Sequence, residues 1–575
     1  MSNITRVTEE LRVGRGDPAY MAHGYLTKVP VPAIVPFIEA YTKPGDVVLD
    51  PFAGSGMTGV AAAVSGRRAL LSDISVLGQH IGSNYVNLVP PEQLRKQCGE
   101  VVRGTIGQLG ELYAVNCRRC DGTARLVKRV WSTVVACASC AQPVVYYDAL
   151  EAAAWHKASA ACPACATPVS ARLDPVGEAP VLDSISCECS PNLVDQPAAE
   201  GPIVDIAQLA FPRVEIAADR VMYQAQALGK SGRTTIASYY SDRNLAVLTV
   251  LREQIAAVDD DALRAKLLFA FTGSLTRASK RYQWSRQRPL NAANANYYVA
   301  PVFYEWNVFD LFNRKVEAAI RSDKWIRAER ASTVLFEETP QLDVHYTIGS
   351  AASLALPDNS VDYIFTDPPF GSNLFYADMA LFQEAWLDGF TDVTEEAVVS
   401  RGARRQASAV RYEELLTGAL REGRRVLKAH GRLSMVFGNS TGANWALVQR
   451  AIRAAGLVVE PDALVVLNKG QRSVKGLASG FEHVATLDLI LTMRAAETTN
   501  IDPQERQHPD VATFTRRLAE TALGQAPSHL YLELLRHGFR ADWNLAKVDL
   551  RSVTQSLLDD GWTIDSKTGV LQRQS

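Results

Sequence analysis

The chain has 575 residues, of which 47% are hydrophobic and 21% are charged, which is typical of a folded protein with several domains. The formal net charge is -2, so the molecule as a whole is not a polycation, and any contact with nucleic acid must use local basic patches. No run of about 18 uncharged apolar residues and no apolar segment near the N-terminus is present, so we expect a cytoplasmic protein without a membrane span.

The first predicted elements lie between residues 31 and 87. Residues 31–42 have the apolar spacing of a helix that Pro44 and Gly45 end. A short apolar strand then leads to Asp50, and an alanine-rich helix follows a glycine-containing turn. Residues 68–72 form a second predicted strand, which leads to Asp73. This order of strand, glycine turn, helix, strand and acid is the beginning of a doubly wound nucleotide-binding sheet.

The glycine turn has the sequence DPFAGSG, residues 50–56. Gly54 and Gly56 can adopt positive φ angles and bring backbone amides close to a ligand, at the N-terminus of the helix that starts near Met57. The Lys-Ser/Thr ending of a triphosphate-binding loop is absent, so the turn suits a less anionic nucleotide-like ligand such as S-adenosylmethionine (AdoMet). Asp73 is placed to accept hydrogen bonds from ribose hydroxyls. A tight turn without a ligand is the alternative for such a motif on its own.

Residues 112–195 contain eight of the nine cysteines, and only Cys98 lies outside. Four closely spaced pairs in about 75 residues favour metal ligands over core thiols. Sixteen residues separate the first two pairs, as in a four-cysteine zinc ribbon, so we predict one or two structural Zn²⁺ ions. We expect the first pair to join the second and the third to join the fourth, with a nested arrangement as the alternative. The pairs are Cys117/Cys120, Cys137/Cys140, Cys162/Cys165 and Cys187/Cys189.

Residues 200–335 are predicted to be helical and to contribute to target recognition. The segment TRASKRYQWSRQR alternates basic and aromatic side chains without an acid, and such side chains can bind phosphates and stack on bases. A solvated helix face or a core-facing aromatic pair is the alternative. The predicted nucleic-acid contacts are Arg277, Lys280, Arg281, Tyr282, Trp284, Arg286 and Arg288.

The α/β pattern resumes over residues 336–497, where three apolar segments each lead into a loop or helix and residues 483–494 form a last strand. We therefore expect residues 1–95 and 336–497 to join into one domain around the long insertion, because long insertions cost little loop entropy. A polar linker after residue 497 precedes a small helical domain at residues 510–575, which ends in a hairpin-like segment.

A second motif, DPPF, ends the predicted strand VDYIF and comprises Asp367, Pro368, Pro369 and Phe370. The two prolines remove backbone donors, so the Asp367 carboxylate and a carbonyl, that of Pro368, remain as acceptors. Two acceptors suit an exocyclic amine, and Phe370 can stack on a base that has left the duplex. Asn373 and Tyr376 are expected to line the same pocket. A DPP triplet alone is a common turn, but its pairing with the glycine turn favours catalysis.

The two motifs together resemble the amino-methyltransferases that modify DNA. The upstream segment HGYLTKVP, residues 23–30, is similar to a further AdoMet motif of that family. With the cysteine pairs included, residues 20–495 resemble the adenine-specific DNA methylases that contain a zinc ribbon. The resemblance implies a Rossmann-like α/β methyltransferase domain, interrupted by a zinc-ribbon and helical insertion, with DNA as substrate. It also implies AdoMet contacts from Tyr25, Lys28, Asp50, Pro51, Phe52, Ala53, Gly54, Gly56, Asp73 and Ile74.

Several alternatives stay open at this point. Methylation of cytosine C5 is excluded because it needs a cysteine nucleophile, typically after proline, and the chain has no such pair. Methylation of cytosine N4 has nearly the same chemistry, although that group more often carries serine in place of Asp367. An RNA amino-methyltransferase and a catalytically silent zinc-dependent adaptor are the other candidates. Other subunits of a restriction or defence system are expected partners.

Overall fold

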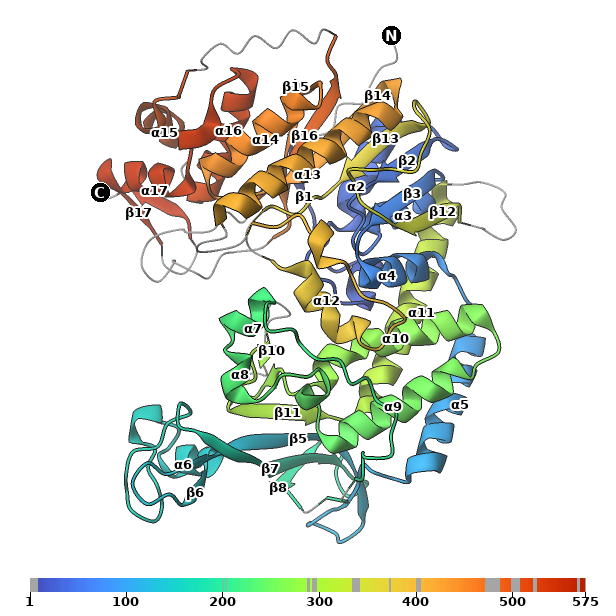
Figure 1. The fold of residues 1–575 in the computed structure, drawn as a ribbon, viewed down its shortest axis with the longest axis vertical. Helices are drawn as coiled ribbons and strands as arrows, with labels where there is room; N and C mark the ends of the chain where they lie inside the picture. The colour runs from blue at the N-terminus through green and yellow to red at the C-terminus, as the bar shows by residue number, and fades with distance from the viewer. Residues whose placement is uncertain are drawn as a thin grey trace.

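The computed structural model has two large β-sheets joined by a layer of helices (Figure 1). The main sheet lies at one end of the molecule, and the second sheet forms most of an arm at the other end. The structure describes residues 9–573 except 200, 203, 287–289, 292–296, 334–341, 372–373, 400–404, 471–486, 498–506, 521–524 and 566–568. No helix among these residues combines the length and the apolar character that crossing a bilayer requires.

The main sheet has eight strands, and all but β16 run parallel to one another. In spatial order they are β1 (Glu10–Arg12), β15 (Leu457–Asn468), β16 (Asp488–Ala495), β14 (Leu427–Phe437), β13 (Val361–Thr366), β2 (Val47–Asp50), β3 (Arg68–Asp73) and β12 (Val344–Ile348). The order reverses between β2 and β13, which come from the two halves of the chain that the insertion separates. This is a Rossmann-like α/β fold, and it confirms the predicted fold class.

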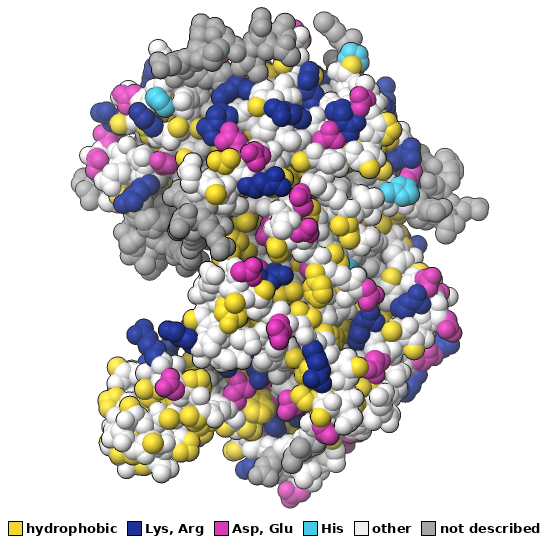
Figure 2. Space-filling view, in the orientation of Figure 1, with side chains coloured by type: hydrophobic (Ala, Val, Ile, Leu, Met, Phe, Trp, Pro, Cys, Tyr) yellow, Lys and Arg dark blue, Asp and Glu magenta, His cyan; other side chains and the backbone are white. Residues whose placement is uncertain are grey.

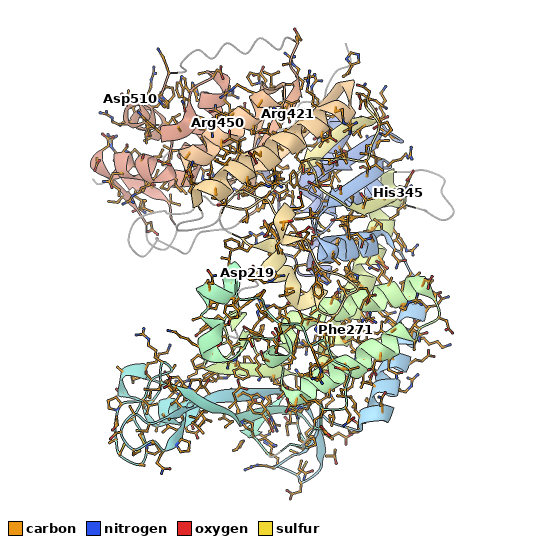
Figure 3. All side chains as sticks on the ribbon, viewed as in Figure 1. Asp219, Phe271, His345, Arg421, Arg450 and Asp510 are labelled. Atoms are coloured by element: carbon orange, nitrogen blue, oxygen red, sulfur yellow. The ribbon has the colours of Figure 1, made fainter. Side chains whose placement is uncertain are left out.

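Both faces of the main sheet are apolar and covered by helices, as is usual for parallel strands. Val48 and Tyr363 face α2 (Val31–Tyr41) and α3 (Met57–Val64), beside α4 (Val76–Val86). The next residues along these strands, Leu49 and Ile364, face the opposite side. There they meet α13 (Arg405–Val426) and α14 (Gly442–Ala454). Arg450 on α14, labelled in Figure 3, donates to Glu413 on α13 at 2.7 and 2.8 Å.

A helical layer connects the main sheet with the arm. Its members are α5 (Pro91–Leu109), α9 (Asp242–Ala256), α10 (Asp261–Ala278), α11 (Val308–Thr333) and α12 (Tyr376–Glu384). Phe271 of α10 lies in the core of this layer (Figure 3), which also takes in Phe382 and Trp386 from the second half of the main-sheet region. Further along α11, Ala319 and Ile326 pack into the main-sheet core. The layer therefore packs against residues on both sides of the insertion.

The arm, residues 114–197, is built on two long antiparallel strands. Strand β11 from the following helical segment pairs with β5, so the two predicted parts of the insertion share one sheet. The strands are β4 (Ala114–Asn116), β5 (Thr123–Ala136), β6 (Pro143–Val145), β7 (Pro175–Ser186), β8 (Val194–Pro197), β9 (Tyr282–Gln283), β10 (Leu290–Asn291) and β11 (Val302–Trp306). Helix α6 (Tyr146–Ala152) lies at the tip, and Figure 2 shows the surface hollowed between the arm and the rest of the molecule.

The C-terminal segment packs onto the main-sheet region. Its elements are α15 (Val511–Ala519), α16 (Pro527–Arg540), α17 (Leu550–Asp559), β17 (Trp562–Ile564) and β18 (Leu571–Arg573), the last two pairing as a hairpin. Tyr531 and Leu535 of α16 belong to the same apolar cluster as Trp445 on α14. Gly442 at the start of α14 donates its amide to Asp549 at 2.7 Å. The segment thus extends one face of the main-sheet core.

Candidate active site

The two motifs meet at the point where the strand order reverses. Strand β2 ends at Asp50 and its neighbour β13 ends at Thr366, one residue before Asp367. The hydroxyl of Thr366 donates to Asp50 Oδ1 at 2.8 Å, and the hydroxyl of Thr58 donates to Oδ2 at 2.6 Å. All three side chains are buried. A hydrogen bond therefore joins segments that are more than 300 residues apart at the edge where doubly wound sheets bind ligands.

The glycine turn requires glycine for two separate reasons. Gly54 and Gly56 have φ angles of +48° and +78°, which side chains rarely adopt. In addition, a Cβ on Gly56 would lie 2.6 Å from the Cα of Gly82 on α4. The Gly54 amide donates to Asp73 Oδ2 at 2.8 Å, and Tyr346 donates its hydroxyl to the Gly54 carbonyl at 2.7 Å. The turn is thus held against β3, α4 and β12.

One cavity of about 1010 Å³ of empty space, open mouth included, contains both motifs. Asp367 and Pro369 line it, together with residues of the glycine turn. The predicted AdoMet contacts in its wall are Tyr25, Lys28, Asp50, Pro51, Phe52, Ala53, Gly54, Asp73 and Ile74. Gly56, Pro368 and Phe370 are not among the lining residues. We call this space the motif cavity.

Burial raises the pKa values of two carboxyl groups in the motif cavity, those of Asp50 and Asp367. Burial raises the pKa of Asp50 to about 7, against the opposing effect of the Thr58 and Thr366 hydrogen bonds. Burial likewise raises the pKa of Asp367 to about 7, while the charge of Lys469 lowers it and Asp488 raises it. Lys469 in turn forms an ion pair with Asp488 at 2.7 Å. Both acids can therefore change protonation near neutral pH.

Asp73 and Tyr25 line the motif cavity directly beside the glycine turn. Asp73 accepts backbone amides on both oxygens, from Gly54 at 2.8 Å and from Ser75 at 2.9 Å, and each oxygen keeps a further lone pair. A Cβ on Gly54 would lie 3.1 Å from the Tyr25 ring, so turn and ring are closely apposed. Carboxylates beside apolar residues such as Ile34 and Met57 suit a nucleoside that carries a positive charge. The residues present therefore fit AdoMet.

Around the second motif, the carbonyls of Pro369 and Phe370 accept hydrogen bonds from the protein, whereas the two acceptors predicted for the target amine do not. Tyr412 donates its hydroxyl to the Pro369 carbonyl at 2.7 Å, and Asn439 donates to the Phe370 carbonyl at 2.9 Å. No hydrogen bond from the described part of the chain reaches the Pro368 carbonyl or the Asp367 carboxylate. The Phe370 ring packs on Phe437 with centroids 5.2 Å apart. Its stacking on a base stays a prediction.

Tyr376 is an aromatic residue that lines the motif cavity close to the second motif. Its hydroxyl lies 3.0 Å from the Thr27 hydroxyl. Asn373, which we expected beside it, lies outside the described residues. Tyr376 and Tyr25 have ring centroids 6.5 Å apart. Their rings thus form an aromatic wall at one end of the cavity.

The eight paired cysteines form two clusters, and their grouping corrects the expected one. The first and fourth pairs meet near the start of β5, and the second and third pairs meet near its end. The expectation that the first pair joins the second was wrong, and the nested alternative holds. The reason lies in β5 itself, because this strand of 14 residues carries the second pair away from the first. The clusters are Cys117/Cys120/Cys187/Cys189 and Cys137/Cys140/Cys162/Cys165.

Cluster geometry fits a tetrahedral zinc ion. Four Sγ pairs between facing cysteine turns lie 3.5 to 3.7 Å apart. Zn–S bonds of about 2.3 Å in a tetrahedron place sulfurs about 3.8 Å apart. In each CxxC turn the fifth residue donates its amide to the carbonyl of the first cysteine and has a positive φ angle. These three residues are Asp121, Ala141 and Ala166.

The structure places the predicted nucleic-acid contacts in four different surroundings. Lys280 forms an ion pair with Glu178 at 2.8 Å. At the arm tip, Trp284 packs on Trp155 and the Arg286 guanidinium lies over the Trp155 ring. Tyr282 is buried between Tyr304 and Trp306, and Arg288 lies outside the described residues. Arg277 and Arg281 line a second cavity next to the motif cavity.

Sequence reasoning missed part of the motif-cavity wall. Residues 349–352 follow strand β12 and line the cavity, as do Glu395 and Glu396. The first segment could have been found, because it follows a strand parallel to β3 and so reaches the same edge of the sheet. Lys469 and Asp488 come from strand ends far along the chain, and no sequence signal placed them beside Asp367.

Sequence comparison places the first motif among methylases. Residues 6–89 match a family model described as DNA methylase. Over 71 residues the chain is 42% identical to "Putative methylase YubD" of Escherichia coli (strain K12), a stretch that spans 12% of this chain and 30% of that protein. These matches support the methylase family for the part of the chain that carries the glycine turn.

Two solved methyltransferase structures are distant matches. A TehB-like SAM-dependent methyltransferase from Corynebacterium glutamicum is 13% identical, with a TM-score of 0.14, over 30% of this chain and 62% of that one. A SAM-dependent methyltransferase from Methanosarcina mazei is 11% identical, with a TM-score of 0.15, over 30% and 77%. Scores this low carry no argument, and the strand order given above defines the fold.

Proposed function

We propose that this chain transfers a methyl group from AdoMet to an exocyclic amino group of a nucleic-acid base, the N6 of adenine in DNA. One observation carries the proposal. The glycine turn and Asp367 lie at the ends of neighbouring strands and line the same cavity, and the Thr366–Asp50 hydrogen bond joins them. The match of residues 6–89 to a DNA methylase model supports DNA as the substrate.

AdoMet, when bound, supplies an activated methyl group on its sulfonium sulfur. The chain contributes position and electrostatics. The glycine turn brings backbone amides to the cavity, and the free lone pairs of Asp73 can accept the ribose hydroxyls. Tyr25, Lys28 and Ile74 form the adjoining wall. Asp50 holds the turn to β13 through the Thr366 hydrogen bond and accepts two more, from the Phe52 amide and the Thr58 hydroxyl, so its role is to position the loop.

Asp367 and the Pro368 carbonyl would accept the two N–H bonds of the target amine. This contact favours a pyramidal nitrogen whose lone pair points at the methyl group. The amine loses its proton only after it has gained the methyl, so Asp367 need not be a strong base. With its pKa raised to about 7, Asp367 can nonetheless receive that proton. Tyr376 is the aromatic side chain placed to contact the extruded base.

The two cysteine clusters would each hold one Zn²⁺. Four thiolates saturate a tetrahedral ion, so both sites would be structural and would leave no position for a substrate. Both lie in the arm, outside the motif cavity. Their role would be to fix the ends of β5 and β7 and to hold the arm in one conformation.

Methyl transfer from labelled AdoMet to duplex DNA and to structured RNA tests the proposal, with nucleoside mass spectrometry of the product. We expect N6-methyladenine in DNA, and we expect Asp367→Ala to lower the rate at least about 100-fold. The matched control is Asp259→Ala, at an exposed aspartate between α9 and α10.

Each other outcome points to one of the alternatives. If the product is N4-methylcytosine, the target base is cytosine and not adenine. If RNA is methylated and DNA is not, the substrate is RNA. If calorimetry shows AdoMet binding but no methyl group is transferred to DNA or RNA, the catalytically silent adaptor is the function that remains. Unchanged transfer by Asp367→Ala would refute the assigned site.

A further inference from the structure

A second cavity lies directly beside the motif cavity, between the main sheet and the helical layer. It has about 1600 Å³ of empty space, open mouth included. Its walls come from the segment 20–28, from α10 and α11, and from α12. Tyr25, Lys28 and Tyr376 line both cavities, so the aromatic wall described above separates them. We call this space the basic cavity.

The basic cavity contains five cationic side chains and no acidic one. They are Lys28, Arg277, Arg281, Arg314 and Lys315. None of the five forms an ion pair with a carboxylate in the described part of the chain. Arg277 and Arg314 are exposed, Lys315 is half-buried, and Lys28 and Arg281 are buried. Positive charge therefore extends from the exposed arginines to the buried residues.

Arg281 is the most unusual member of this set. Its side chain is only 2% exposed, and its Nε and Nη2 atoms have no hydrogen-bond partner among the described residues. The guanidinium lies over the Phe382 ring, 4.1 Å from the centroid. Tyr239, Tyr240 and Tyr297 are its neighbouring polar groups, and no carboxylate of a described residue forms an ion pair with it. A buried, unpaired arginine is costly, and a bound anion would remove that cost.

Lys28, which is buried, and Lys315, which is half-buried, add to the positive charge of the basic cavity. The Lys28 ammonium donates to two neutral carbonyls, those of Tyr20 and His23; burial and then the charge of Lys315 lower its pKa to about 7, against the opposing charge of Asp17. The Lys315 ammonium donates to the Ala22 carbonyl at 2.9 Å, and burial and then Arg277 lower its pKa to about 8. Cations that lower each other's pKa values gain from an anion placed between them.

We propose that the basic cavity binds a backbone phosphate of the nucleic-acid substrate, next to the nucleotide whose base enters the motif cavity. The inference rests on the proposed function for the identity of the ligand. A base and its phosphate are separated by one sugar, and the two cavities are separated by one aromatic wall. The Arg281 guanidinium presents its N–H groups in a planar fork that fits two phosphate oxygens. Arg277 and Arg314 would contact the flanking phosphates.

Arg281→Met tests the proposal, because methionine keeps the apolar stem and removes the charge. We expect the affinity for a mixed-sequence DNA duplex to fall about 10- to 100-fold, as when a charged hydrogen bond is removed. The slope of log affinity against log salt should become shallower by about 0.9 for each phosphate that the variant no longer binds. AdoMet affinity, measured by calorimetry, should stay unchanged. The melting temperature without DNA should rise, because the variant no longer buries an unpaired charge.

The matched control is Arg321→Met, which removes an exposed arginine from α11 outside the basic cavity. It should leave the salt slope nearly unchanged. An Arg281→Met protein that binds duplex DNA like the wild type at every salt concentration overturns the proposal. So does a variant that loses AdoMet affinity alone, since the cavity would then hold the carboxylate of AdoMet.

Free phosphate is the other source of the same chemistry. If inorganic phosphate raises the melting temperature of the wild type but not of Arg281→Met, while DNA affinity is equal in both, the site binds free phosphate and the proposal fails. These readouts do not use methyl transfer. Failure of the basic cavity is therefore distinguishable from failure of the methyltransferase assignment.

Discussion

The main sheet and the arm both bury carboxylates, but they compensate them in different ways. In the main sheet, Asp50 is surrounded by hydroxyls and an amide, and burial raises its pKa to about 7. In the sheet of the arm, burial would raise the pKa of Glu305, but the two hydrogen bonds and the charge of Arg243 lower it. Carboxylates with a fixed cation stay ionised and serve structure, whereas those held by neutral donors can titrate.

The pair Arg129–Asp183 is a second buried ion pair in the arm. The two residues lie opposite each other on β5 and β7, and two hydrogen bonds of 2.7 and 2.9 Å join them. Both side chains are almost fully buried. The cysteine clusters extend the rule, because eight thiolates would be compensated by two Zn²⁺. The arm thus adds a buried ion pair and two cysteine clusters to a small apolar cluster, while the main sheet has a larger apolar core.

Metal removal should have the largest effect on the arm. Treatment with a chelator should expose the backbone amides of residues 114–197 to hydrogen exchange, because structural zinc contributes about 10 kcal/mol or more to folding of small domains. AdoMet binding should persist, since its predicted contacts lie in the main-sheet region. Hydrogen exchange read by mass spectrometry checks both statements.

The nested grouping adds a sharper version of this test. Cys120→Ser should lower the zinc content from two ions to one and expose β8 but not α6. Equal exposure of both elements would contradict the grouping. If purified, reduced wild-type protein contains no zinc, the prediction that zinc stabilises the arm is wrong.

A smaller effect is expected when one buried ion pair is broken. Arg129→Met leaves Asp183 buried without a partner and should destabilise the arm by about 3–5 kcal/mol. The double variant Arg129→Met/Asp183→Leu should recover most of that loss, because two apolar side chains can replace a buried pair. Urea unfolding followed by hydrogen exchange in β5 and β7 measures the difference. Arg125→Met, which removes an exposed ion pair with Asp310 from the same strand, is the control and should change little.

The smallest effect concerns pH. The raised pKa of Asp50 means that its ionisation in the folded protein is unfavourable, so its contribution to stability falls as the pH rises from about 4 to about 7. The melting temperature of Asp50→Asn relative to wild type should therefore increase between pH 5 and pH 8. Because the pKa of Glu305 is lowered, its contribution to stability is lost only when the pH falls below its usual pKa of 4.5. The difference in melting temperature between Glu305→Gln and wild type should therefore stay constant between pH 5 and pH 8. Parallel pH trends in the two variants would contradict the comparison.

The sequence was sufficient for the strands of the main sheet that carry the motifs, because their signals are local. Strands β2, β3 and β13 each end at a residue of a motif or directly before one, and the periodic segments 31–42 and 68–72 match α2 and β3 closely. The segment 457–468 gave no expected strand, although it forms β15. It contains Pro461 and two acids, and β15 has an irregular register against β16 at that point. Pairing with β16 and β1 outweighs the local sequence there.

The arm and the basic cavity could not be derived in the same way. Cysteine spacing gave the ligands but not their grouping, since the grouping depends on how far β5 extends before the chain turns. The basic cavity collects Lys28, Arg277 and Lys315 from segments far apart in the sequence. Only Arg277 and Arg281 lay in a recognisable basic segment, and their neighbours in that segment point elsewhere. Contacts between distant segments are set by packing, which a single sequence does not display.

Strand β5 starts three residues after Cys120 and ends one residue before Cys137, so the same continuous strand connects the two cysteine clusters. Fourteen residues in an extended strand span roughly 45 Å, at about 3.3 Å for each residue. The tip of the arm therefore sits at a fixed reach from the helical layer, like the end of a spacer of constant length. Insertion or deletion of one residue in β5 would turn every following side chain to the other face of the sheet and misplace the whole tip of the arm.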